Sequence, residues 1–189
     1  MKIQQSIVGM TAVVALSFVL GNLAHRAEGA DTAEARLRKL EDVEAIHSLL
    51  VHYGRELDKR DYKAYGALFA QDGSWKGGMG SATGPDAIAK MVAAGFEKMS
   101  PSLYTNSYHV MTSFDIDVNG DIATAWSRWT WVVVGADGKP RPERAGHYED
   151  TLVRERGEWR FKSRQAFTEI NPSRRRVSAS GRRTGWDWS

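Results

Sequence analysis

The chain has 189 residues, with 26 basic and 23 acidic side chains and a formal net charge of +3. It contains no cysteine, which excludes disulfides, thiolate nucleophiles, iron–sulfur clusters and cysteine-based zinc sites. The positive excess is concentrated in residues 171–189, whose five arginines and one aspartate give a net charge of +4. The body of the chain is therefore slightly acidic, and we expect no nucleic-acid partner.

Residues 1–29 have the pattern of a secretory signal peptide. Lys2 precedes an apolar run over residues 7–20, and small residues follow between positions 27 and 30. We expect cleavage after residue 29 or 30, export to a bacterial periplasm, and contact with a membrane only through this segment. An uncleaved membrane anchor is the alternative, because the run could be extended to about 18 residues.

Two helices are predicted next. Apolar side chains recur at steps of three and four over residues 37–57, which predicts a long amphipathic helix that begins near Thr32. A short second helix is expected from Asp61, which suits an N-cap, through Phe69, with its end near residues 71–73.

The segment that follows is rich in glycine. Its glycines do not have the spacing of a dinucleotide-binding loop, so we interpret them as a loop or hairpin. Pro85 follows Gly84 and suits the first position of a third helix, which would carry Phe96 on its inner side.

Beyond Pro101 the apolar period changes to two, the period of a strand. Turn signals with glycine separate the stretches, and hairpins would join them into an antiparallel meander. Helices first and strands later indicate an α+β domain, whose long strands must bend around the helices to bury one face. The four predicted strands cover residues 105–117, 122–134, 146–154 and 158–168.

The C-terminal residues 171–189 are rich in Arg, Ser and Gly and are predicted to form a basic, flexible tail. The alternative is an arm that clasps a neighbouring subunit or an acidic surface through its arginines, Trp186 and Trp188.

Several stretches of the sequence resemble SnoaL-like, or nuclear transport factor 2-like, proteins, notably bile acid dehydratase and, more distantly, scytalone dehydratase. The resemblance implies a cone-shaped α+β barrel over residues 30–170, with N-terminal helices packed in a curved antiparallel sheet. It also implies a homo-dimer or homo-trimer, since the open sheet of this fold commonly dimerises. The stretches that carry the resemblance are 42–46, 53–58, 69–73, 108–109 and 157–161.

The resemblance also implies a site. Tyr53, Asp58 and His109 match the tyrosine, aspartate and histidine of the bile acid dehydratase pocket. Asp58 and His109 also match an aspartate and a histidine of scytalone dehydratase. The second catalytic histidine of scytalone dehydratase falls near Trp131, which puts that particular reaction in doubt.

The chemistry of these three side chains agrees with such a site. His109 can take and return a proton near neutral pH, and Asp58 could fix its tautomer. Tyr53 is a donor that could polarise a carbonyl or assist a departing hydroxyl. No metal or cofactor is needed. Five residues separate Tyr53 from Asp58, about 140° on a helix, so both face a pocket only if it lies over the helix end.

Each of these residues also has a structural interpretation. Asp58 could be a cap, His109 a satisfied polar group and Tyr53 a core residue. On the strand that contains His147 and Tyr148, alternation turns the two side chains to opposite faces, and we favour Tyr148 as the pocket residue. Trp131 and Phe69 are further candidates for the substrate-binding wall, and no spacing of histidines indicates a metal site.

We therefore expect an exported, cofactor-independent lyase (dehydratase) or isomerase that acts on a small, apolar, hydroxylated ring compound. A non-catalytic periplasmic binding protein for an apolar small molecule is the alternative. A third interpretation is an interaction module that dimerises through its sheet.

Overall fold

The computed structural model describes residues 4–99, 106–135 and 137–171, with side chains described from Thr32 onward. The chain divides into two compact units, residues 1–45 and 46–189. The predicted signal segment and most of the predicted tail lie outside the described side chains. Among the described residues, no helix is both long and apolar enough to span a membrane.

Helix α1 (Gln4–Lys59) begins in the first unit and ends in the second. Within the first unit, Leu37 and Leu40 are exposed, although the predicted apolar stripe begins with them. In the second unit the stripe is buried, with Ile46 and Leu50 fully inaccessible. The apolar period therefore locates the helix, and only its C-terminal turns belong to the core.

Two shorter helices follow. The predicted N-cap is confirmed, because the Asp61 carboxylate accepts the Ala64 backbone N–H at 2.9 Å ahead of α2 (Tyr62–Gly66). Helix α3 (Pro85–Glu97) begins at the predicted proline. The predicted extent of the second helix is wrong, because the chain is already extended at Phe69.

The described strands form one six-stranded sheet in the order β2-β1-β6-β5-β4-β3. The predicted meander of four antiparallel strands is confirmed for β3 to β6. Strand β1 pairs with β6 in parallel, so the sheet is mixed and not wholly antiparallel as predicted. The strands are β1 (Phe69–Gly77), β2 (Gly80–Thr83), β3 (Ser107–Asn119), β4 (Ile122–Val134), β5 (Pro140–Glu155) and β6 (Glu158–Ile170).

Strand β1 is held by its pairing with β6, which it joins to β2 in the sheet. Phe69 pairs with Phe161 of β6, and the Leu68 carbonyl accepts the Phe161 N–H at 3.0 Å. The glycines that were interpreted as a loop or hairpin form the β1–β2 hairpin, in which Gly77 pairs with Gly80.

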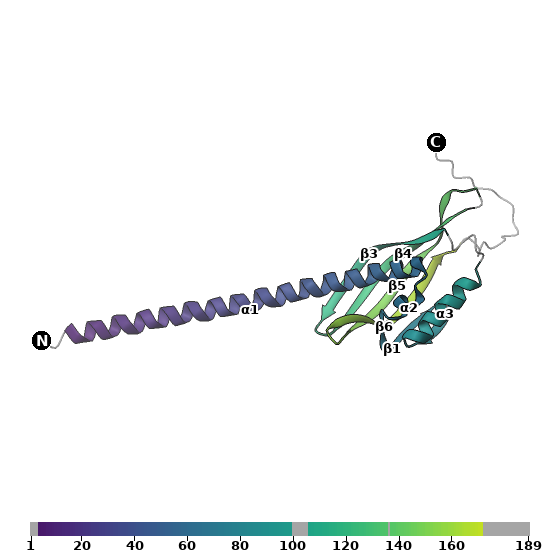
Figure 1. Cartoon of the computed structure of the whole chain (residues 1–189). Coiled ribbons are helices and arrows are strands. Elements are labelled where there is room, and N and C mark those ends of the chain that lie inside the picture. The colour runs from purple at the N-terminus through teal and green to yellow at the C-terminus, as the bar shows by residue number, and fades with distance from the viewer. Residues whose placement is uncertain (1–3, 100–105, 136, 172–189) are drawn as a thin grey trace, which may run out of the picture. The chain divides into compact units, whose positions relative to one another are not determined.

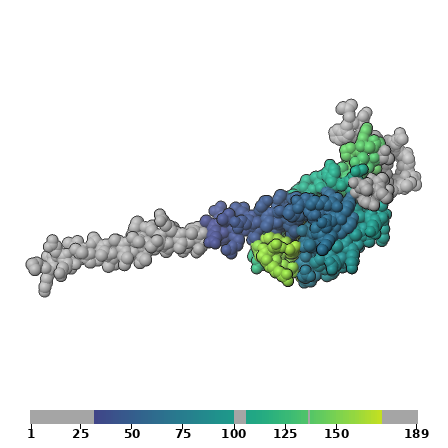
Figure 2. All heavy atoms as spheres, in the orientation of Figure 1, coloured from purple at the N-terminus to yellow at the C-terminus, as the bar shows by residue number. Residues whose placement is uncertain are grey.

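The core lies between one face of the sheet and the helices. The C-terminal turns of α1, with α2 and α3, cover this inner face of the curved strands (Figure 1). The hairpin turn between β5 and β6, yellow-green in Figure 2, is exposed. Burial of the apolar side chains on the inner face is the main stabilising contribution to this α+β fold.

Candidate active site

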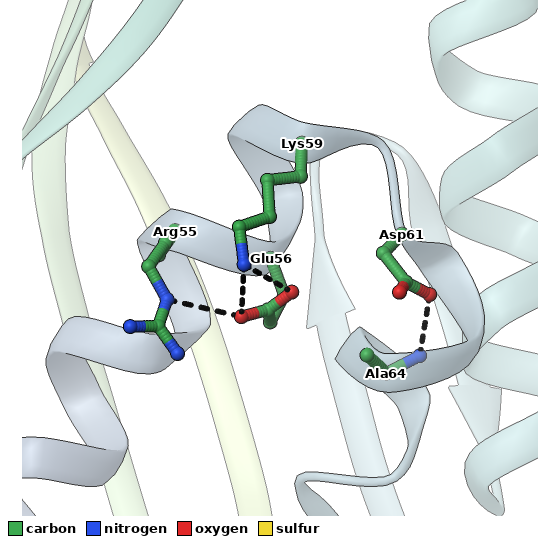
Figure 3. A network of polar contacts seen from close by, with 5 residues as sticks. All are labelled: Arg55, Glu56, Lys59, Asp61 and Ala64. Carbon is green, nitrogen blue, oxygen red and sulfur yellow. Dashed lines mark hydrogen bonds and ion pairs between the residues drawn. The ribbon is translucent and has the colours of Figure 1, made fainter.

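The end of α1 is held by a polar network. Glu56 accepts Arg55 Nε and Lys59 Nζ, each at 3.1 Å, beside the Asp61 cap of α2 (Figure 3). Arg60 has a left-handed backbone, with φ of 62°, and donates to the Ser107 hydroxyl at 2.8 Å at the start of β3. The Arg60–Ser107 hydrogen bond fastens the end of α1 to the first residue of β3.

This fastening brings Asp58 against His109. The Asp58 carboxylate lies 2.7 Å from His109 Nδ1 and accepts the His109 backbone N–H at 3.0 and 3.1 Å. The His109 side chain is only 8% exposed and that of Asp58 23% exposed. The carboxylate therefore fixes the orientation of the ring, and Nε2 has no hydrogen-bond partner among the described residues.

Tyr53, five residues before Asp58, is at the centre of a second polar group. Its hydroxyl accepts the Tyr65 hydroxyl at 2.7 Å and Trp75 Nε1 at 3.0 Å. Its ring packs edge-on against Tyr148 at 5.4 Å. The two donors orient the Tyr53 oxygen.

A buried ion pair lies beneath these tyrosines. Arg164 donates to both oxygens of Asp150 at 2.6 and 2.7 Å, and neither side chain is exposed. The guanidinium carbon also lies 3.8 Å from the centre of the Tyr53 ring and 4.2 Å from that of Tyr148. Cations are attracted to aromatic faces, so this pair holds both rings from below.

The surroundings of these rings disfavour phenolates. Burial raises the pKa of Tyr65 and of Tyr148 well above 10, and the neighbouring Tyr53 hydroxyl adds to this rise, whereas Arg164 opposes it. Both side chains are therefore hydrogen-bonding phenols at neutral pH.

These elements enclose a cavity of about 1000 Å³. His109, Tyr53 and Tyr148 border it from the inner face of the sheet and from α1, with Trp75, Trp129 and Trp131 adding aromatic surface. A cavity of this size accommodates a small organic molecule.

The opposite wall of the cavity contains methionines. Met79 comes from the β1–β2 hairpin, Met91 from α3 and Met99 from the residues after α3. Met79 also packs on α3, since a side chain at Gly95 would overlap its sulfur. The unbranched thioether adapts its shape readily, so this methionine wall is more deformable than the aromatic one.

Residues 38–165 match the SnoaL-like domain family. The chain belongs to this family. No curated protein sequence matches it.

Solved structures resemble this SnoaL-like chain. A nuclear transport factor 2-like protein with a cystatin-like fold, from Novosphingobium aromaticivorans, has 29% identity and a TM-score of 0.63 over 70% of this chain and 84% of that one. A candidate scytalone dehydratase from the same organism has 27% identity and a TM-score of 0.57 over 69% and 86% of the two chains. A protein of unknown function from Nostoc punctiforme has 25% identity and a TM-score of 0.61 over 70% and 95%.

The SnoaL-like fold brings together most of the predicted site residues. His109 and Tyr53 border the cavity, as do Trp131 and Tyr148. Asp58 does not border it and contacts it only through His109. The angle of about 140° between Tyr53 and Asp58 is therefore no obstacle, because only Tyr53 has to face the cavity.

Phe69 requires a correction. It was predicted as a wall residue, but it is 2% exposed and packs in the core against Phe161 at 5.1 Å and Tyr65 at 5.9 Å. Phe69 is the first residue of β1, and its side chain is not part of the cavity wall.

The Arg164–Asp150 pair was missed by the sequence reasoning. Counting alternate residues from Trp159 and Phe161 predicts that Arg164 faces outward. A β-bulge lies between the Thr151–Ser163 and Leu152–Phe161 pairs, and it shifts the alternation by one residue. Arg164 is turned inward as a result. Asp150 lies two residues after Tyr148 and was a possible signal, since a buried carboxylate needs a cation.

The other histidine cluster lies on the opposite face of the sheet from Tyr148. His147 Nδ1 is 2.7 Å from Glu169, which also accepts Arg128 at 3.0 Å. The His147 ring stacks on Phe167 at 4.6 Å. Among the described side chains, no group of three His, Asp or Glu residues is arranged to hold a metal ion.

Proposed function

We propose that this protein is a cofactor-independent lyase (dehydratase) or isomerase that acts on a small hydroxylated ring compound. One observation carries the proposal: a histidine whose Nδ1 is held by a carboxylate borders an aromatic cavity. This combination supports proton transfer at Nε2, since the carboxylate keeps Nδ1 protonated and steadies the imidazolium.

In a dehydration, His109 Nε2 would remove a proton from a carbon beside an electron-withdrawing group. The electrons of the C–H bond form the new C=C bond while the C–O bond breaks. The departing hydroxide takes a proton from the Tyr53 hydroxyl or from the imidazolium and leaves as water. In an isomerisation, the imidazolium instead returns the proton to another carbon of the same substrate.

The comparisons support the dehydratase as the first choice. The candidate scytalone dehydratase shares the fold at 27% identity. The resemblance of the sequence implies that Asp58 and His109 match an aspartate and a histidine of that enzyme class. By the same resemblance, the second catalytic histidine of scytalone dehydratase falls near Trp131. We therefore assign the second proton to Tyr53, as the resemblance to bile acid dehydratase also implies.

A binding protein for an apolar molecule is the second candidate. It is favoured by the burial of Tyr53, which is 1% exposed and already accepts two hydrogen bonds. In that case Tyr53 would be a core residue, and His109 would only donate or accept a hydrogen bond to a ligand.

We expect Asp58→Asn to lower turnover roughly 10²- to 10⁴-fold, because the amide cannot stabilise an imidazolium. Tyr53→Phe should cost less, since a water molecule can replace the phenol. Ligand affinity should change little in both variants, because transition-state contacts are removed. The assay follows loss of water from hydroxylated ring compounds, and deuterium uptake from heavy water, by mass spectrometry.

Asp61→Asn is the matched control, because Asn remains a good N-cap and Asp61 lies on the same helix-to-helix turn. It should leave turnover unchanged. If Asp58→Asn weakens binding and no compound loses water or takes up deuterium, the binding-protein reading replaces the enzyme.

We also propose that residues 1–29 direct export. The basic residue, apolar run and small residues motivate this proposal. N-terminal sequencing of the exported protein should find its first residue near Ala30 or Asp31. Full-length protein in the membrane fraction would instead identify an uncleaved anchor.

A further inference from the structure

A row of three side chains crosses the cavity wall from the histidine. His109 on β3 pairs directly with Trp131 on β4, and Trp131 pairs directly with Arg144 on β5. Directly opposed residues of antiparallel strands project to the same face. The imidazole lies nearly parallel to the indole, with ring centres 6.3 Å apart, and the Arg144 guanidinium carbon is 5.7 Å from the indole centre.

Two donors in this row have no acceptor among the described residues. Trp131 is 4% exposed and its Nε1 has no hydrogen-bond partner within the described part of the chain. Arg144 Nε is likewise buried without an acceptor there. Buried N–H groups are nearly always hydrogen-bonded in native proteins, so these two donors indicate an acceptor that the described residues do not supply.

The charge around the cavity has the sign that attracts an anion. Arg144 and Lys98 border the cavity, and Arg144 Nε has no hydrogen-bond acceptor among the residues described. The acid that borders the cavity, Glu169, is already engaged by His147 and Arg128. A guanidinium beside an indole N–H is suited to a carboxylate.

We propose that Arg144 and Trp131 bind a carboxylate group of the ligand, while His109 acts at its other end. The ligand would be a ring carboxylic acid, and the inference rests on the proposed function in taking this cavity as the ligand site. Strands β3 and β5 are two strand spacings apart, roughly 10 Å, which leaves room for a ring between the carboxylate and the reacting carbon.

The test compares acids with neutral alcohols of the same shape. The probes are naphthalene-2-carboxylate with naphthalene-2-methanol, and benzoate with benzyl alcohol, each titrated into the full chain by calorimetry and by tryptophan fluorescence. In the unsubstituted protein at least one acid should bind more tightly than its alcohol. Its affinity should fall as salt is added, because salt screens the attraction of charges.

Arg144→Gln should weaken binding of the acid roughly 10- to 100-fold, the effect expected for a lost charge-assisted hydrogen bond, and leave the alcohol unchanged. Arg144→Lys should restore part of the preference by keeping the charge. Trp131→Phe, which removes only the N–H and part of the ring, should weaken binding of the acid by a smaller factor. Arg154→Gln is the control, because it removes one positive charge from the same strand at a site outside the cavity wall.

The inference is overturned if no acid binds at millimolar concentration, if acid and alcohol bind equally, or if Arg144→Gln and Arg154→Gln have equal effects. These outcomes are independent of turnover, since His109→Ala should retain the preference for the acid. A protein that binds the acid through Arg144 but transforms nothing would keep this inference and lose the proposed function. A protein that dehydrates neutral compounds without any dependence on Arg144 would keep the proposed function and lose this inference.

Discussion

The two faces of the sheet carry the same pair of groups in different surroundings. On the inner face His109 Nδ1 lies 2.7 Å from Asp58, and on the outer face His147 Nδ1 lies 2.7 Å from Glu169. His147 Nε2 lies 3.6 Å from a second carboxylate, that of Glu149. His147 does not border the cavity. The hydrogen-bond distance therefore does not distinguish the two pairs, whereas the position of His109 at the cavity does.

Each face also carries an arginine–carboxylate pair. The inner pair, Arg164 with Asp150, is wholly buried, whereas the side chains of Arg128 and Glu169 on the outer face are 50% and 42% exposed. Removing one member of a buried pair leaves an uncompensated charge, and removing one member of an exposed pair leaves a solvated one. Matching substitutions on the two faces should therefore differ in their effects on activity and on stability.

The largest expected difference is in activity. His109→Ala should lower turnover roughly 10²- to 10⁴-fold, because it removes the acid–base group at the cavity. His147→Ala removes an equivalent ring from the outer face and should leave turnover within about twofold. Steady-state rates of the two variants on the same substrate make the comparison. Equal losses in both would mean that the inner pair has no special role.

The next difference is in stability. Arg164→Leu should lower the free energy of unfolding by about 3–5 kcal/mol, since Asp150 would remain buried without a cation. Arg128→Leu should cost less than about 1 kcal/mol, because the pair is exposed and screened. Urea denaturation measures both. Adding Asp150→Leu to Arg164→Leu should recover much of the loss, and failure to recover it would show that Arg164 acts mainly by packing on the rings.

The smallest difference concerns alkaline pH. Because burial raises the pKa of Tyr65 and Tyr148, the folded protein keeps these protons when the unfolded chain has lost them. Their contribution to stability is present below a pH of about 10, the unfolded pKa, and is lost as the pH rises further. The loss is about 1.4 kcal/mol per pH unit for each tyrosine.

Tyr148→Phe should remove one of these two contributions and make the alkaline decline less steep. Urea midpoints at a series of pH values test this, together with tyrosinate absorbance. If Tyr65 and Tyr148 ionise to tyrosinate before the protein unfolds, water reaches their hydroxyls and burial does not raise their pKa as described.

The elements with local signals were predictable from the sequence. Strand β4 has the predicted bounds, residues 122–134, and α3 begins at Pro85 as expected. The pairing of β1 with β6 was not predictable, because β6 lies far along the chain and a parallel pairing leaves no hairpin signal. The glycines marked only the turn from β1 to β2. A bulge in this pairing between Phe69 and Ser74 also removes the period-two pattern on which strand prediction depends.

The site was predictable in its local parts. Tyr53, Asp58 and His109 were identified by resemblance, and Tyr148 by alternation. Arg144 could have been found by the same alternation, since it lies four residues before Tyr148 on one face of β5. Arg164 could not, because the inserted residue of a bulge is a property of the pairing between two strands, which one strand alone does not reveal.

The methionine wall has a consequence for how this protein could change over time. In the proposed function, the chemistry is confined to the aromatic side of the cavity, where strands and ion pairs fix each group, and the methionines of the hairpin and α3 only enclose what is bound. Substitutions in the hairpin or α3 could then admit bulkier or smaller rings without disturbing the proton donors and acceptors. New substrates would be reached by altering Met79 or Met91, while the reaction itself is inherited unchanged.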